Sequence, residues 1–78
     1  MALQTLKQAE LRKIYRIVAV KDGALLRLAE LGFVAGTTIV LKAIAPLKQT
    51  YLIELRGYEL AIRSSLADAI LLEEATWN

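Results

Sequence analysis

The sequence contains no cysteine and no histidine. Without thiols it cannot form a disulfide, and without thiol and imidazole ligands it cannot build the usual zinc cage. The same absence removes the thiolate nucleophile and the histidine base that activates a serine. Its four glycines stand apart from one another, so there is no glycine-rich phosphate loop. We therefore expect a protein that is not an enzyme, with no catalytic residues and no cofactor.

Long apolar runs and runs of one charge are also missing. No stretch approaches the roughly 18 apolar residues of a membrane span, and no basic segment followed by an apolar one marks a signal peptide. This pattern predicts a cytoplasmic protein. The net charge is +2, and the ten basic and eight acidic residues are interspersed. Such a mixture indicates a solvated surface and not a nucleic-acid interface.

What the sequence has in excess is aliphatic side chains. Of its 78 residues, 56% are hydrophobic and only 6% aromatic, and the mean hydropathy is +0.44. This length predicts one domain over residues 1–78, and so small a domain buries only about 60–65% of its unfolded surface. The surplus favours an exposed apolar patch for a partner or for self-association. The alternative is that the short strands of a small barrel bury most of it.

Apolar spacing predicts a short helix that begins at Leu25 and ends at a glycine. Leu25, Leu28 and Leu31 recur every three residues and share one stripe. Gly32 follows where a left-handed C-cap residue belongs, because glycine adopts that conformation at little steric cost. We expect this helix to act as a lid on a β structure.

The remaining elements are two helical turns and five short strands. One turn follows a capping box of Thr5 and Gln8, and the other begins at Ser64 or Ser65 and runs through Ala69. Alternating or β-branched segments predict strands over residues 12–20, 37–43, 50–56, 58–63 and 70–73. Together these elements predict a mostly β fold, a small and partly open SH3-like barrel with a lid helix and a helical turn before its last strand.

Alternation also assigns an inward face to the later strands. The predicted inward residues are Ile39, Leu41 and Ala43, then Tyr51, Ile53 and Leu55, then Leu60 and Ile62, and finally Ile70 and Leu72. The first strand is apolar on both faces, so its register stays open. Between the third and fourth strands, Gly57 predicts a tight hairpin because it tolerates a positive φ.

Four ordered pieces of the sequence carry a family resemblance. They are Leu-Arg-Leu-Ala-Glu-Leu-Gly-Phe-Val-Ala-Gly-Thr over residues 26–37, Ala-Pro-Leu over 45–47, Leu-Arg-Gly-Tyr-Glu-Leu-Ala-Ile-Arg over 55–63 and Ala-Ile-Leu-Leu-Glu over 69–73. This set resembles the ferrous iron transport protein A (FeoA) family from about Leu6 to Glu73. A similar domain is the C-terminal module of iron- and manganese-dependent repressors. One departure is Ala35, where the family often has proline.

The resemblance implies a small cytosolic accessory protein of bacterial ferrous iron uptake. Its implied partner is the large membrane transporter, protein B, whose cytosolic part carries a GTPase domain that the accessory protein would bind and modulate. Family descriptions also include transition-metal binding. The residues argue against a metal site, because Fe(II) sites usually use imidazole and the only acidic candidates are Glu54, Glu59, Glu73 and Glu74. We therefore assign no metal ligands.

A protein-binding surface is the function that the residues favour. The candidates are large side chains outside the inward strand faces and one arginine: Leu26, Phe33, Pro46, Leu47, Leu52, Tyr58 and Arg56. Aromatic and arginine side chains commonly anchor interfaces, which favours Tyr58 with Arg56. Leu47 is favoured by its loop, whereas Phe33 also suits a role in covering the helix end. A nucleic-acid-binding barrel or a self-associating module with exposed edge strands is the alternative.

Overall fold

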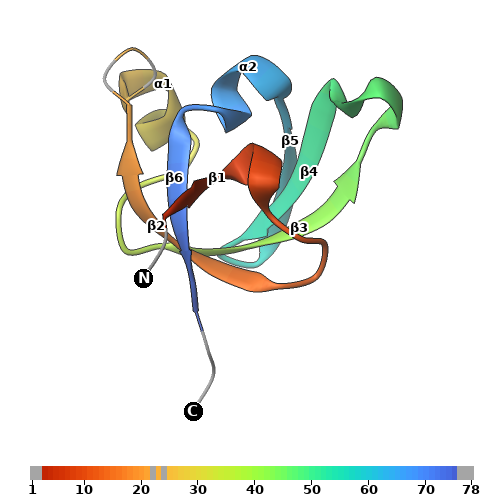
Figure 1. Cartoon of the computed structure of the whole chain (residues 1–78). Coiled ribbons are helices and arrows are strands. Elements are labelled where there is room, and N and C mark those ends of the chain that lie inside the picture. Colours follow the sequence, from red (N-terminus) through yellow and green to blue (C-terminus); the bar gives the residue numbers. More distant parts are fainter. Residues whose placement is uncertain (1–2, 22, 24, 76–78) are drawn as a thin grey trace.

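The computed structural model describes residues 3–21, 23 and 25–75, which form one antiparallel sheet curled around a core (Figure 1). The sheet has six strands in the order β1-β6-β2-β3-β4-β5. The elements in chain order are β1 (Gln4–Thr5), η1 (Leu6–Gln8), β2 (Ile14–Val20), α1 (Leu25–Glu30), β3 (Thr38–Ile44), η3 (Pro46–Lys48), β4 (Thr50–Leu55), β5 (Tyr58–Arg63), α2 (Ser64–Ala67) and β6 (Ile70–Glu74).

All five predicted strands are present, and the structure adds a sixth. The additional strand, β1, has two residues and pairs with β6 through Gln4 and Thr5. It is too short to show an alternation in the sequence. The capping box is supported by the Thr5 N–H, which donates to Gln8 Oε1 at 2.9 Å. The serine caps were predicted wrongly, because α2 begins at Ser64 itself and has no side-chain cap.

The core lies inside the curled sheet and beneath the helical segments. Its largest fully buried side chains are Tyr15, Tyr51, Phe33, Leu6, Ile17, Leu28, Ile39, Leu41, Ile53, Leu55, Ile70 and Leu72. The inward faces predicted for β4 and β6 are confirmed, and Leu60 and Ile62 of β5 also pack toward the core. In β2 the buried face belongs to Tyr15 and Ile17.

Two β-bulges change which side chains face the core. The pairing of β3 with β4 shifts between Leu41 and Ala43. Ala43, predicted to face inward, is exposed, and Ile44 packs against the core in its place. The reason is that the extra residue of a bulge reverses the alternation beyond it. A second shift in β2, between Ile17 and Ala19, lets Val20 join the core.

The C-terminal end of α1 confirms the predicted glycine cap. Gly32 has a φ of +100°, and its N–H donates to the Ala29 carbonyl at 3.0 Å. The Phe33 N–H donates to the Leu28 carbonyl at 2.9 Å, which completes a Schellman motif. Of the predicted leucine stripe, Leu28 is fully buried and Leu31 is partly exposed. The side chain of Leu25 is outside the described part of the structure.

Three connections bring side chains to the surface in left-handed backbone conformations, the first at Arg12 before β2, with a φ of +66°. Arg56 and Gly57 form the two-residue turn between β4 and β5, with φ values of +51° and +86°. Two positive φ values identify a type I′ hairpin, as the glycine predicted. In η3, Leu47 and Lys48 have φ values of +67° and +55°, although neither is glycine. A left-handed conformation is uncommon for such residues and costs free energy.

Candidate protein-binding surface

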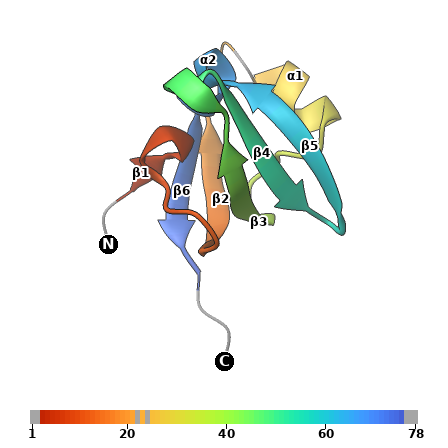
Figure 2. The same ribbon diagram turned by 90° about the vertical axis from the view of Figure 1, so that its right-hand side faces the viewer.

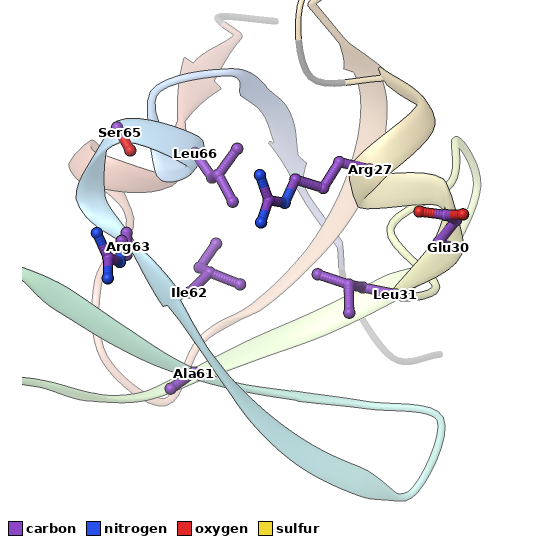
Figure 3. Close-up of a pocket in the computed structure, with 8 residues that line it drawn as sticks. All are labelled: Arg27, Glu30, Leu31, Ala61, Ile62, Arg63, Ser65 and Leu66. Atoms are coloured by element: carbon purple, nitrogen blue, oxygen red, sulfur yellow. The ribbon is translucent and has the colours of Figure 1, made fainter.

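A hollow of about 660 Å³ lies between α1, β5 and α2 (Figure 3). Its lining consists of Arg27, Glu30, Leu31, Ala61, Ile62, Arg63, Ser65 and Leu66. Leu31, Ile62 and Leu66 provide an apolar wall and floor, and Arg27 extends from α1 over the hollow toward Leu66. Glu30 lies at the opposite rim, and Arg63 is at the outer edge on β5. The hollow therefore combines an apolar base with a mostly cationic rim.

A side-chain hydrogen bond joins the end of α1 to the beginning of β5. The Tyr58 hydroxyl donates a hydrogen bond of 3.0 Å to the Leu31 carbonyl, just beyond the last turn of α1. The same hydroxyl would lie 2.9 Å from a Cβ at Gly32, so a side chain at that position would disturb the contact. Since the carbonyls that end a helix have no partner within it, Tyr58 supplies one of the missing donors. Tyr58 thus fixes the distance between the helix end and the edge of the sheet.

Three of the predicted binding residues lie at the end of the barrel where α1, α2 and η3 are found (Figure 1). Leu26 on α1 and Leu47 on η3 have 76% and 86% of their surface exposed, and Pro46 is exposed as well. We call this end, with Leu26, Arg27, Pro46, Leu47, Ser65 and Leu66, the helical end. A smaller hollow, lined by Gln49 and Thr50 on one side and by Ser64 of α2 on the other, shares Arg63 and Ser65 with the larger one. The two hollows therefore meet at the beginning of α2, within the helical end.

The other predicted residues lie elsewhere. Arg56 and Tyr58 are at the β4–β5 hairpin, which projects at the opposite end of the barrel (Figure 2). Arg56 Nη2 donates to Thr37 Oγ1 at 3.4 Å, and Tyr58 is 47% exposed in addition to its bond to α1. Leu52 is half-buried in β4. Phe33 was a wrong choice, because it is fully buried beneath the end of α1 and has no surface to offer a partner.

Three of the four acidic candidates, Glu54, Glu73 and Glu74, pair with cations along the sheet. Glu54 contacts Lys42 at 3.4 Å, and Glu73 contacts Arg16 at 3.3 Å. Lys13 bridges the carboxylates of Glu10 and Glu74. Its hydrogen bond to Glu10, and to a smaller extent the one to Glu74, raises the pKa of Lys13 above the ordinary 10.5. Across residues 3–21, 23 and 25–75, no three acidic side chains gather as a metal site would require.

Sequence reasoning missed the hollow itself. Arg27 comes from α1 and Leu31 follows its last residue, while Ile62, Arg63 and Leu66 come from a segment about thirty residues later. Each of these side chains has an ordinary local explanation, as a polar helix position or a strand residue. Only the folding of β5 back toward α1 brings them together. No local pattern could have identified that meeting point.

A family model for the FeoA domain matches residues 1–74. The chain belongs to the FeoA family. This membership links it to ferrous iron transport and confirms the resemblance seen in the sequence. No curated protein gave a significant match. In the part of this FeoA chain that the structure describes, no helix is long and apolar enough to cross a membrane.

Solved structures agree with the assignment to FeoA. A FeoA-like protein from Clostridium acetobutylicum is 25% identical, with a TM-score of 0.87 over 100% of this chain and 93% of that one. FeoA of Stenotrophomonas maltophilia, an SH3 domain protein complexed with zinc, is 26% identical, with a TM-score of 0.77 over 90% and 89%. The manganese-activated repressor ScaR is 26% identical, with a TM-score of 0.81 over 91% of this chain and 35% of its own. The predicted SH3-like fold is confirmed.

Proposed function

We propose that this protein is a non-enzymatic accessory protein of ferrous iron uptake that works in the cytoplasm. It acts by direct contact with the cytosolic, GTPase-bearing part of the ferrous iron transporter, protein B. Family membership supports the pathway, and the helical end supports the mode of action. The sequence has a surplus of aliphatic side chains, and the most exposed of those described, Leu26 and Leu47, lie at this end.

The exposure and the strained backbone of Leu47 are the main support for the proposal. The residue is 86% exposed, and its backbone has a φ of +67°. A leucine in this position gains little from burial and is held in a conformation that glycine or asparagine adopts more easily. A large apolar side chain at such a position lowers the stability of the free protein. A bound partner that covers the side chain would offset that cost.

The helical end also has the composition of a binding surface. It contains two exposed leucines, the exposed polar residues Arg27 and Ser65 and the partly buried Leu66. Protein interfaces combine a few apolar anchors with a polar rim, and arginine is enriched among the residues that contribute most to binding. The nucleotide state of the transporter's GTPase domain then provides a way to regulate the contact.

Calorimetric titration with the purified cytosolic part of the transporter tests the proposal, with and without a GTP analogue. We expect saturable binding by the native protein and at least tenfold weaker binding by Leu47→Asp, a difference of about 1.4 kcal/mol. Leu11→Asp is the matched control, since Leu11 is half-exposed in the loop before β2, away from the helical end.

Two results would contradict the proposal. One is that folded native protein fails to bind in every nucleotide state, which would point to another partner or to the nucleic-acid alternative. The other is that Leu11→Asp weakens binding as much as Leu47→Asp, because a specific surface cannot depend equally on both. Circular dichroism of each variant establishes that the comparison is between folded proteins.

A further inference from the structure

We propose that the hollow between α1 and β5 binds an extended acidic segment of the partner, which pairs with the edge of β5 as an added strand. This inference rests on the proposed function, because it names the chemistry of the partner segment and the way it is recognised. Three features carry it: a free strand edge, an apolar base and a cationic rim.

The free edge follows from the position of β5 and from the hairpin. In the sheet formed by the described residues, β5 pairs with β4 and stands last in the order. The two-residue turn makes Leu55 and Tyr58 a hydrogen-bonded pair, and every second pair beyond it is bonded as well. The backbone groups of Glu59, Ala61 and Arg63 therefore point away from β4. An unpaired strand edge of this kind is a template for another extended segment.

The base of the hollow selects an apolar side chain on one face of that segment. Ile62 and Leu66 lie along its floor and Leu31 forms the wall on the α1 side (Figure 3). Side chains of an added strand alternate between the two faces of the sheet. One set would reach this base, while the other would stand beside the exposed side chains of Ala61 and Arg63. The volume of about 660 Å³ accommodates a few side chains and not a folded domain.

The rim selects negative charge for the remaining side chains. Arg27 extends over the hollow and Arg63 stands at its outer edge, and neither forms a salt bridge with any described residue. Glu30, the acidic residue of the lining, is turned away from Arg27. Guanidinium groups bind carboxylates through paired hydrogen bonds. A segment that alternates acidic and apolar residues therefore matches both parts of the hollow.

The free part of β5 sets the length of the segment. The Tyr58 hydroxyl, at the beginning of β5, bonds to the Leu31 carbonyl at the end of α1, so the segment lies beyond Tyr58 along β5. That part of the edge comprises residues 59–63. Five residues of a strand span about 17 Å, so the contact involves about five residues of the partner.

The probe is a synthetic octapeptide of alternating glutamate and valine, capped at both ends, added to the full chain labelled with ¹⁵N. We expect saturable chemical-shift changes at the backbone amides of Glu59, Ala61 and Arg63. A peptide with lysine in place of glutamate tests the charge. A peptide with N-methyl groups on alternate amides tests the strand pairing, since it cannot donate to the edge of β5. Both altered peptides should bind at least tenfold more weakly.

Protein variants test the rim. Arg27→Glu and Arg63→Glu should each weaken binding of the acidic peptide at least fivefold, and the lysine peptide should then bind better than it does to the native chain. Lys7→Glu is the matched control, because Lys7 is exposed on η1 and makes the same change of charge outside the hollow. Thermal unfolding checks that each variant is folded. We expect all three to fold, because the three replaced residues are exposed.

Several outcomes would overturn the inference. One is that the acidic peptide causes no chemical-shift change at the β5 amides. Another is that the lysine peptide or the N-methyl peptide binds as tightly as the acidic peptide. A third is that Lys7→Glu weakens binding of the acidic peptide as much as Arg27→Glu does. The transporter titration separates this inference from the proposed function. If Arg27→Glu leaves that binding intact while Leu47→Asp removes it, the accessory role stands and the hollow is not its site. If the acidic peptide binds as described but the transporter does not, the hollow stands and the partner is a different one.

Discussion

Replacing Leu47 by asparagine should make the protein more stable and a weaker binder at the same time. Leu47 has a φ of +67°, and the left-handed region costs a side chain with a Cβ about 1 kcal/mol or more. Asparagine tolerates this region because its short amide hydrogen-bonds to the local backbone. The variant should therefore recover most of that cost, about 1 kcal/mol.

The loss of burial is small enough not to reverse this gain. The residue is 86% exposed, so roughly a seventh of its surface is covered. Complete burial of a leucine contributes about 1.5–3 kcal/mol, which makes the loss about 0.3 kcal/mol. The net stabilisation is then about 0.7 kcal/mol. For a chain of this size, that corresponds to a rise of about 3–6 °C in the melting temperature.

Thermal and urea unfolding followed by circular dichroism measure the effect, with equal m-values as the condition for comparing midpoints. Leu26→Asn is the control, because Leu26 is exposed to a similar degree but lies in α1. There asparagine is a poorer helix former than leucine, so stability should fall by about 0.5 kcal/mol. If Leu47→Asn is no more stable than the native chain, the strain at Leu47 does not exist, and the main support for the binding surface is lost.

Three further changes test the contacts around α1 and β2. Gly32→Ala should lower the free energy of unfolding by about 1–3 kcal/mol, because it combines a positive φ with a crowded Cβ. Gly36→Ala is the control, since Gly36 has a φ of +93° but open space around its Cβ position, and it should lower the free energy of unfolding by less. An equal loss in the two variants would refute the role of crowding. Tyr58→Phe should cost about 1 kcal/mol in urea unfolding because the Leu31 carbonyl loses its donor, and an unchanged midpoint would argue against that bond. Lys13→Gln should lower the melting temperature near neutral pH. The raised pKa of Lys13 means that its contribution is complete below pH 10.5 and is lost as the pH rises through the higher folded-state value, so a deficit that persists at higher pH would contradict this linkage.

Local backbone chemistry explains why much of the fold could be predicted from the sequence. The hairpin at Gly57 and the helix end at Gly32 depend on conformations that glycine adopts readily, so both appear at the predicted residues. The alternation of β4 was equally clear, since Tyr51, Ile53 and Leu55 face one way without interruption. These features are decided within a few residues, and a single sequence contains that information.

The features that could not be predicted depend on residues far apart in the chain. The bulge before Ala43 arises from pairing with β4, and Lys42 and Ala43 give no sign of it in β3 alone. Phe33 was a candidate because it lies outside the predicted inward strand faces, but the Schellman motif turns it beneath α1, where it covers the helix end. The hollow is the strongest case, since it exists only where α1 and β5 approach each other.

The position of Tyr58 changes how a binding experiment on it must be interpreted. Sequence reasoning proposed Tyr58 as a direct anchor, yet its hydroxyl also holds the end of α1. Tyr58→Asp would remove the ring and the hydrogen bond together, so weaker binding would not tell the two roles apart. Tyr58→Phe retains the ring and removes only the bond. If the partner contacts the ring, the phenylalanine variant binds normally although it is less stable. If Tyr58 acts by fixing the width of the hollow, the same variant loses affinity for the acidic peptide, whereas the contact at Leu47 is unchanged.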